Sequence, residues 1–326
     1  MDTDETRDDD TLQESAPKTI HRVRIAITGT TGRLGAALAR VYSQQGFETH
    51  PLPRTACDLR DPGEIETALR GIDFDFLVHC AAVTSVDYCE SNPEEARAVN
   101  AEAPGVIARH CAGRGARMAH VSTDYVYSGD SAGHRVESDP CHPRSVYGRS
   151  KLEGERRVLD ASAGFLVLRT SWIFGPDRPG FPEQMIHRAC ETDDLEAICD
   201  KFSTPTHSHD FASLLLPLLE NPDAEGVFNL SNSGACSWKE YGECALEAAK
   251  EAGIPVQSTS VRGIRLAEMK SFQAPRPANT PMSTSRYAEF TGQSPRPWQD
   301  ALREYVHGVR KTPPMNAPAR GRVDLM

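Results

Sequence analysis

Short apolar segments alternate with amphipathic segments over the first half of the chain. The apolar segments have the length and β-branched content of buried strands, and the segments between them space their apolar residues as a helix does. The predicted strands are residues 23–28, 47–52, 76–81, 117–123 and 165–171. This alternation predicts an α/β fold with a Rossmann-type, doubly wound parallel sheet.

Helix start and stop signals lie between these strands. Residues 33–45 have apolar side chains at helical spacing and end before Gly46, which suits a C-terminal stop. Asp61 is an N-cap acid followed directly by proline, so a helix is expected to begin there. Pro93 is expected to open a further helix that ends near Gly113.

The regular alternation loosens beyond residue 170. Two more helices are predicted at 207–220 and 237–253, and Ser237 with Glu240 forms a capping box for the second. We expect a smaller C-terminal lobe here. The predicted division is a disordered acidic tail at 1–20, the doubly wound domain at 21–170, the smaller lobe at 171–310 with some elements returning to the sheet, and a flexible tail at 311–326.

The composition narrows the class of protein. The chain has 326 residues, of which 39% are hydrophobic and 25% charged, and no apolar run approaches the length of a membrane span. The formal net charge is −10, and about half of that excess lies within residues 1–20, which lack the apolar stretch of a signal peptide. We therefore expect a cytoplasmic protein that binds neither membranes nor nucleic acid.

Nine cysteines are scattered along the chain without a C-x-x-C pair. Their odd number and spacing favour reduced thiols that pack as small hydrophobic side chains. His207, His209 and Asp210 lie close together in the sequence, but without a further ligand cluster we expect surface or capping roles for them and no metal site.

Glycines recur at every third position directly after the first predicted strand. Gly29, Gly32 and Gly35 have the spacing G-x-x-G-x-x-G, with Thr31 and Leu34 between them. A tight turn, a close backbone approach to a pyrophosphate and close helix packing each favour a residue without Cβ. A simple turn is the structural alternative. The position between a strand and a helix favours a dinucleotide site, formed by all five residues.

The tip of the second predicted strand distinguishes the two nicotinamide cofactors. An acid there binds the ribose 2′-hydroxyl of NAD, whereas arginine accommodates a 2′-phosphate. This chain has no acid at the tip, but Arg54 lies just beyond it and Arg33 lies in the glycine loop. We predict NADPH, with NADH as the alternative. Solvated surface arginines would be the structural explanation.

A tyrosine and a lysine share one helical face after the fourth strand. Tyr147 and Lys151 are four residues apart, and Ser122 and Thr123 end that strand. A phenol with an ordinary pKa is a poor proton relay, and an adjacent ammonium would lower that pKa. We predict that Tyr147 is a general acid assisted by Lys151, and that a hydroxyl from Thr123 or Ser122 holds a substrate carbonyl.

The motifs together resemble those of extended short-chain dehydrogenases/reductases, and more narrowly the dTDP-4-dehydrorhamnose reductase family. The matching stretches are the glycine loop, DL at 58–59, CAA at 80–82, VDYCESNPEEARAVN at 86–100, STDYVYSG at 122–129, YGRSK at 147–151, RTSWIFG at 169–175 and RPANTPMST at 276–284. The resemblance covers roughly residues 23–307. It implies NADPH-dependent reduction of the C4 keto group of dTDP-4-dehydro-L-rhamnose to dTDP-L-rhamnose.

The resemblance also implies roles for single residues. The catalytic set would be Thr123, Tyr147 and Lys151. The cofactor would be positioned by Asp58, Leu59, Ala81, Ala82, Asn100 and Ser122, together with Tyr147 and Lys151. The nucleotide sugar would be bound by Val86, Asp87, Thr123, Asp124, Trp172 and Arg276. The domain at 21–170 would then bind NAD(P), and the lobe at 171–310 the substrate, in a monomer or a homodimer.

The chain departs from the family pattern at several positions. Where the family usually has D-Q-x-G-x-P-T, Lys201 replaces the glutamine and Ser203 the glycine. In the later segment Thr280 replaces serine, and Met282 and Ser283 replace leucine and aspartate. These departures leave the identity of the sugar open.

Two other functions stay open on the sequence. The regulatory β subunit of methionine adenosyltransferase is similar to these reductases, and its F-P-T-H segment is echoed by STPTHSHDFA here. A protein of that kind would bind NADP(H) without turnover and associate with a synthetase. A nucleotide-sugar epimerase would retain NAD tightly, which the missing acid at the second strand disfavours.

Overall fold

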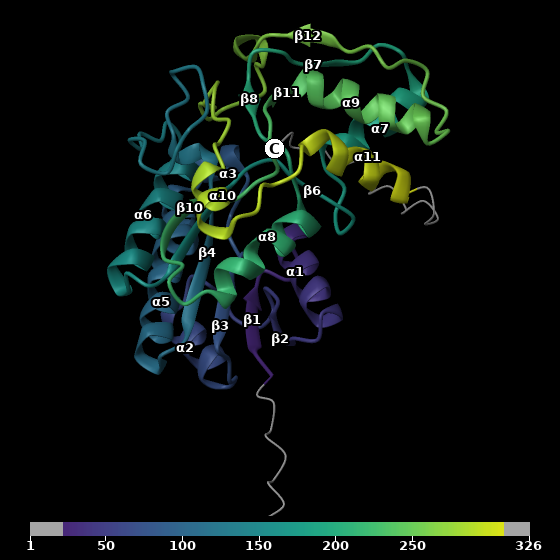
Figure 1. Ribbon diagram of the computed structural model, residues 1–326. Coiled ribbons are helices and arrows are strands. Elements are labelled where there is room, and N and C mark those ends of the chain that lie inside the picture. The colour runs from purple at the N-terminus through teal and green to yellow at the C-terminus, as the bar shows by residue number, and fades with distance from the viewer. Residues whose placement is uncertain (1–21, 310–326) are drawn as a thin grey trace, which may run out of the picture.

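A six-stranded parallel sheet forms the centre of the larger part of the molecule (Figure 1). The computed structural model describes residues 22–309, so the predicted tails lie outside the described residues. The sheet has the order β10-β5-β4-β3-β1-β2. Its strands are β1 (Arg24–Thr28), β2 (Glu48–Leu52), β3 (Phe76–His79), β4 (Arg117–Thr123), β5 (Leu166–Thr170) and β10 (Gly226–Asn229). The predicted doubly wound α/β class is confirmed, and the strand order reverses between β1 and β3.

Helices cover both faces of the sheet. One face packs against α1 (Arg33–Gln44), α8 (Ser208–Glu220) and α10 (Ser285–Thr291), and the other against α2 (Pro62–Arg70), α5 (Ala103–Arg114) and α6 (Val146–Ala161). Side chains of β1 show the alternation, since Ile25 and Ile27 join the first core and Ala26 the second. Burial on both faces explains why the inner strands β1, β3 and β5 are mostly apolar in sequence, whereas the edge strand β2 is more polar and more exposed.

The chain beyond β5 builds a second layer of helices and short strand pairs beside the carboxyl ends of the sheet, and also returns to the sheet as β10 (Figure 1). Its helices are α7 (Phe181–Glu191), α9 (Trp238–Glu251), α11 (Trp298–Val309) and the 3₁₀ turn η3 (Leu266–Glu268). Its strands pair as β6 (Ile173–Phe174) with β9 (Thr206–His207), β7 (Glu196–Ile198) with β12 (Arg262–Ile264), and β8 (Phe202–Ser203) with β11 (Cys236–Ser237).

Several predicted helix ends are confirmed. The Asp61 carboxylate accepts hydrogen bonds from the backbone N–H groups of Gly63 and Glu64 at the start of α2. Gly46 follows α1 with a φ of +93°, a left-handed conformation that stops a helix. Ser237 and Glu240 form the predicted capping box of α9.

The helix predicted to open at Pro93 and to end near Gly113 is confirmed at both ends, but it contains a π-helical turn that was not predicted. A separate helix, α3 (Val86–Ser91), precedes it. The predicted helix consists of α4 (Pro93–Arg97), the π-helical turn η1 (Ala98–Glu102) and α5. Pro104 lies in the first turn of α5 and has no N–H to bond the carbonyl four residues earlier, so the regular ladder is interrupted there. The π turn carries Asn100, which was predicted to position the cofactor.

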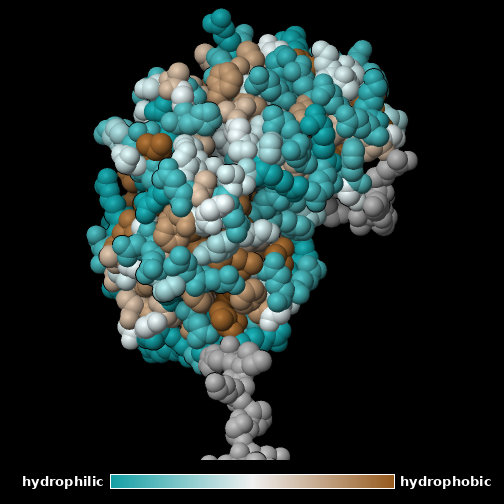
Figure 2. Space-filling view, viewed as in Figure 1, coloured by the Kyte–Doolittle hydropathy of each residue, from teal (hydrophilic) through white to brown (hydrophobic). Residues whose placement is uncertain are grey.

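No helix within residues 22–309 combines the length and the apolar character needed to cross a bilayer. Over the same residues no cluster of three or more histidine, cysteine, aspartate or glutamate side chains is arranged to hold a metal ion. The face in Figure 2 is mostly hydrophilic, with hydrophobic residues gathered in its lower half, where α8 and the sheet lie in Figure 1.

Candidate active site

The glycine loop packs directly against the end of the neighbouring strand. Gly29 has a φ of +71°, and a Cβ there would lie 2.8 Å from the backbone nitrogen of Ala81. A Cβ on Gly35 would lie 2.4 Å from the carbonyl oxygen of Gly29. Ala81 therefore meets the loop, and Ala82 follows it in the chain; both are half-buried. They lie where the strand order reverses, which is where open α/β sheets bind their ligands.

The start of α1 fits a diphosphate. Gly32 is its N-cap residue, and within the described chain this helix starts with no side-chain cap and no acid in its first turn. The first N–H groups of α1 are thus left for an anion, which the helix dipole also favours. Thr31 is exposed and Leu34 half-buried beside them, as a cradle for a dinucleotide requires.

The two arginines predicted to favour NADPH lie in different environments. Arg33 donates hydrogen bonds to the carbonyl oxygens of Ile173, Arg178 and Pro179, at 2.7 to 3.0 Å, so the chain itself already holds its guanidinium. Arg54 is exposed in the turn after β2. The geometry therefore favours Arg54 over Arg33 for a 2′-phosphate.

Asp58 and Leu59 lie just beyond that turn. The Asp58 carboxylate pairs with Arg60 at 2.6 Å, and the hydrogen bonds from Arg60 lower the pKa of Asp58 to about 2. Leu59 is half-buried and packs on the core under α2 and α5. Asp58 is thus held as an anion by Arg60, while Leu59 anchors the same segment on the core.

Tyr147 and Lys151 lie one above the other on α6, as predicted, and both are buried. Ser145 caps this helix by accepting from the N–H of Gly148. The expected lowering of the tyrosine pKa is wrong: burial raises the pKa of the Tyr147 phenol above its ordinary value, and a hydrogen bond with Thr123 offsets only part of the rise. Tyr147 therefore keeps its proton at neutral pH.

The lysine ammonium points toward β4. Lys151 Nζ donates to the carbonyl oxygen of Val121 at 2.8 Å and lies 3.2 Å from Nε2 of His120. Burial lowers the pKa of Lys151 to about 8, while the carboxylate of Glu155, one turn further on, raises it. Burial also drives the pKa of His120 well below its ordinary value, so its neutral ring can accept from the ammonium. Sequence reasoning missed His120.

The two hydroxyls at the end of β4 face different partners. Thr123 lies with Tyr147, and its Oγ1 accepts from the N–H of Tyr125 and donates to Asp124. Ser122 instead donates to Glu155 at 2.5 Å. Of the two, the structure brings Thr123 to the proposed proton donor.

Glu155 belongs to a buried ion pair that sequence reasoning missed. Its carboxylate binds the Arg169 guanidinium through two hydrogen bonds, at 3.0 and 2.7 Å, and both side chains are almost wholly buried. Glu155 continues the helical face of Tyr147 and Lys151 at a spacing of four residues, which is the signal that would have pointed to it.

Asn100 locks the loop after β3. Its side chain accepts from the N–H of Val83 at 2.9 Å and donates to the carbonyl of Val83 at 3.0 Å and to Ser150 at 3.1 Å. A Cβ on Gly154 would lie 2.2 Å from the Asn100 carbonyl oxygen. Residue 154 must therefore be glycine for α6 to pack this closely against η1. Asn100 thereby fixes the loop that carries Ala81 and Ala82.

Asp87 and Arg276, both predicted to bind substrate, lie together. Two nitrogens of Arg276 bind the two Asp87 oxygens at 2.6 and 2.8 Å, and the guanidinium packs 4.1 Å from the centroid of the Phe272 ring. Burial acts to raise the pKa of Asp87, but Arg276 and the N–H of Ala274 lower it overall. The pair joins the start of α3, where Val86 is buried, to the segment before residue 277.

Trp172 holds a strained backbone beside these elements. Its φ of +42° is in the left-handed region, which side chains other than glycine rarely adopt. The half-buried indole stacks on Tyr241, with centroids 6.0 Å apart, and meets Trp238 edge-on. Such strain is typical of ligand sites and is compatible with the predicted substrate role.

Asp124 is enclosed by residues that depart from the family pattern. It begins the 3₁₀ turn η2 (Asp124–Val126) and is 1% exposed. Ser203 donates to its Oδ2 at 2.8 Å and Thr280 at 2.5 Å. Asp124 therefore accepts hydrogen bonds from three side chains of the protein, those of Thr123, Ser203 and Thr280.

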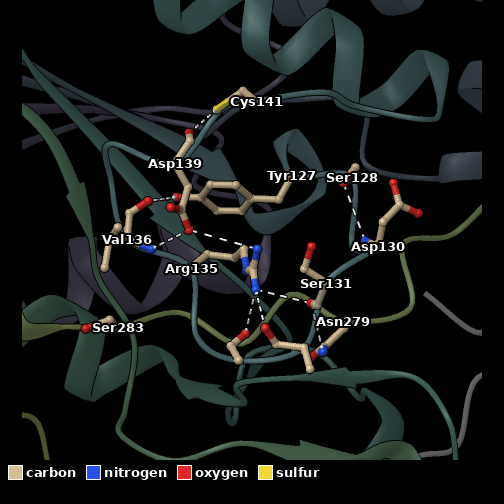
Figure 3. Close-up of polar contacts among 12 residues, drawn as sticks. Tyr127, Ser128, Asp130, Ser131, Arg135, Val136, Asp139, Cys141, Asn279 and Ser283 are labelled. Atoms are coloured by element: carbon tan, nitrogen blue, oxygen red, sulfur yellow. Dashed lines mark hydrogen bonds and ion pairs between the residues drawn. The ribbon is translucent and has the colours of Figure 1, made fainter.

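A loop after η2 fixes the segment that carries Thr280 (Figure 3). One nitrogen of Arg135 donates to the carbonyls of Ser131, Ala132 and Gly133, at 2.8 to 3.1 Å. The backbone N–H of Arg135 donates to Pro281, and Asn279 donates to Ser131. Residues 279–283 are thereby held against the loop that follows η2.

The chain is similar to known proteins over nearly all of its described length. The family model described as RmlD substrate binding domain matches residues 23–311. The chain is 36% identical to dTDP-4-dehydrorhamnose reductase of Mycobacterium tuberculosis, covering 86% of this chain and 91% of that protein. It is 32% identical to the spore coat polysaccharide biosynthesis protein SpsK of Bacillus subtilis, covering 87% and 96%.

A solved structure shows the same likeness. The dTDP-4-dehydrorhamnose reductase of Bacillus anthracis in complex with NADP is 25% identical, with a TM-score of 0.80 over 88% of this chain and 99% of that one.

Proposed function

Because the chain belongs to the RmlD substrate binding domain family, we propose that it reduces dTDP-4-dehydro-L-rhamnose to dTDP-L-rhamnose with NADPH. Relatives named dTDP-4-dehydrorhamnose reductase share 30 to 36% identity with it over most of its length. The observation that carries the proposal is the buried, protonated Tyr147 beside Thr123 at the end of β4, on the same carboxyl edge of the sheet as a glycine cradle that fits a dinucleotide.

The chain's own groups supply the proton. When bound, the nicotinamide supplies the hydride to C4 of the sugar. Tyr147 gives its phenolic proton to the oxygen that was the C4 carbonyl, so that the ketone becomes an alcohol. Thr123 orients that oxygen, and Lys151, whose ammonium is held against β4 by Val121 and His120, completes the predicted catalytic set.

The substrate side of the proposal rests on α3 and the second layer. We place the nucleotide sugar against Val86, Asp87 and Trp172, with Arg276 anchored by Asp87 at its edge. A fixed, planar guanidinium suits a diphosphate. Residues 21–170 would thus bind the cofactor and residues 171–310 the sugar, in a cytoplasmic monomer or homodimer.

Replacing the exposed Arg54 by alanine is expected to lower the preference for NADPH over NADH. A lost charge-assisted hydrogen bond to the 2′-phosphate is worth about 1.5–3 kcal/mol, so the ratio of the two kcat/KM values should fall about tenfold or more. Steady-state kinetics with both cofactors measure this. Arg70→Ala is the control, because Arg70 is also exposed but pairs with Glu66 on α2. An unchanged ratio would remove Arg54 from the cofactor site.

The function is tested by following NADPH oxidation with purified protein and enzymatically prepared dTDP-4-dehydro-L-rhamnose. Turnover that yields dTDP-L-rhamnose supports the proposal. NADPH binding without turnover would point to the regulatory-subunit alternative, and tightly retained NAD with interconversion of a nucleotide sugar would point to an epimerase. Turnover of a different keto-sugar alone would refute the rhamnose assignment.

A further inference from the structure

An arginine of the glycine loop binds a segment of the second layer. Arg33 is the first residue of α1 and is half-buried. Each of its three guanidinium nitrogens donates to a backbone carbonyl, those of Ile173, Arg178 and Pro179, at 2.7, 3.0 and 2.8 Å. These hydrogen bonds join the cradle for the dinucleotide to both ends of the segment 173–179, which lies 140 residues or more further along the chain.

The segment bound by Arg33 lies between two aromatic residues that contact the same rings. Trp172 precedes the segment, and Phe181, the first residue of α7, follows it. Trp172 stacks on Tyr241 with ring centroids 6.0 Å apart, and Phe181 stacks on the same ring at 5.3 Å. Each also meets the Trp238 ring at 5.7 Å. Arg33 therefore fixes the backbone on both sides of one aromatic cluster.

The backbone of Trp172 needs such a restraint. Its φ of +42° lies in the left-handed region, which a bulky side chain adopts only where its surroundings enforce it. The Trp172 carbonyl accepts from the N–H of Thr206 at 3.3 Å, and the carbonyl of the next residue, Ile173, accepts from Arg33. A guanidinium is planar and rigid, so it fixes the direction of the carbonyls that it binds. Without Arg33, the Trp172 backbone should relax and the indole should leave its stack.

We propose that Arg33 is a positioning residue that holds Trp172 in place for the nucleotide sugar. The proposal rests on the proposed reductase function, in which Trp172 is part of the substrate site. The sequence predicted a 2′-phosphate contact for Arg33, but its nitrogens bind the chain itself. Arg33 acts instead through the backbone of residues 173–179, so that one side chain joins the cofactor cradle to the aromatic cluster of the second layer.

The test changes the guanidinium to an ammonium. Arg33→Lys keeps the positive charge that a phosphate would attract, but it loses the planar set of donors that reaches three carbonyls. We expect the Kd for dTDP-L-rhamnose to rise about tenfold, as is usual for residues coupled through a backbone shift, and the Kd for NADPH to stay unchanged. Isothermal titration calorimetry measures both. A higher Kd for NADPH alone would make Arg33 a cofactor ligand and overturn the proposal.

Two further variants make the result specific. Trp172→Ala should weaken the binding of dTDP-L-rhamnose, and adding Arg33→Lys should weaken it no further, because both changes act on one contact. Additive losses would overturn the proposal. Arg117→Lys is the matched control: Arg117 is also half-buried and donates to two backbone carbonyls, those of Leu219 and Ala224, but it begins β4 at the opposite end of the sheet. It should leave both Kd values unchanged.

A measurement without ligand separates this proposal from the proposed function. Acrylamide quenching of tryptophan fluorescence reports mainly Trp172, because the other two tryptophans, Trp238 and Trp298, are only 4% and 2% exposed. The quenching constant should rise in Arg33→Lys and not in Arg117→Lys. An unchanged constant in Arg33→Lys overturns the proposal, whether or not the sugar is turned over. A raised constant in a protein that binds no dTDP-L-rhamnose would support the hold of Arg33 on Trp172 and refute the reductase.

Discussion

Tyr147→Phe is expected to lower kcat by about 10²- to 10⁴-fold, the usual contribution of a positioned general acid. Burial keeps the phenol protonated at neutral pH, so the variant loses a group that carries its proton throughout the neutral range. The ring should stay in place, because it packs edge-on against Tyr125 with centroids 5.6 Å apart. NADPH binding, followed by fluorescence, should therefore be unchanged while steady-state turnover falls.

Tyr287→Phe is the matched control for this variant. Tyr287 is also fully buried, but it lies in the core between the sheet and its helices, away from the proposed site. Its loss should leave kcat at the wild-type value. If Tyr147→Phe kept normal turnover, another group would have to donate the proton, and the assignment of the catalytic set would fail.

The sheet and its glycine cradle were predictable because they depend on local rules. Five of the six strands were placed within about two residues, since strands buried on both faces are continuously apolar. The turn after β1 needs glycine because its backbone lies against that of Ala81, and a glycine is visible directly in the sequence. The sixth strand, β10, was not predicted, because its pairing with β5 links segments about 60 residues apart.

The interior of the helix that opens at Pro93 was harder to predict than its ends, because Pro104 permits two outcomes. Pro104 is tolerated in the first turn of a new helix and equally breaks a continuous one, and the spacing of apolar residues does not distinguish these cases. The result is a π turn that carries Asn100 against α6. The contact is possible because Gly154 has no Cβ, a fact that only the packing shows.

The site residues also fall into those predicted from local spacing and those brought together only by the fold. Tyr147 and Lys151 were found because helical spacing brings them together. The surroundings of Asp124 were not found, because Ser203 and Thr280 come from segments 79 and 156 residues away. The electrostatics were also beyond the sequence: burial outweighs the neighbouring charges at Tyr147, so its pKa is raised where a lowering was expected.

Glu155→Gln is expected to lower the free energy of unfolding by about 3–5 kcal/mol. The substitution leaves the Arg169 guanidinium buried between β5 and α6 without its carboxylate, and it weakens the hydrogen bond from Ser122. It also removes the charge that raises the pKa of Lys151. The ammonium should then be lost at lower pH than about 8, so the alkaline limb of kcat should move down. Urea unfolding and a pH profile measure the two effects.

Two variants isolate the buried pair as the cause. Glu66→Gln breaks a pair with Arg70 on α2 in which both side chains are exposed, and it should cost only a small fraction of the loss because water screens such pairs. Replacing Glu155 and Arg169 together by leucine and methionine leaves no unpaired charge, so it should recover part of the stability while turnover stays impaired. If Glu155→Gln were as mild as Glu66→Gln, solvent would have to reach Arg169, and the pair would not be what joins α6 to β4 and β5.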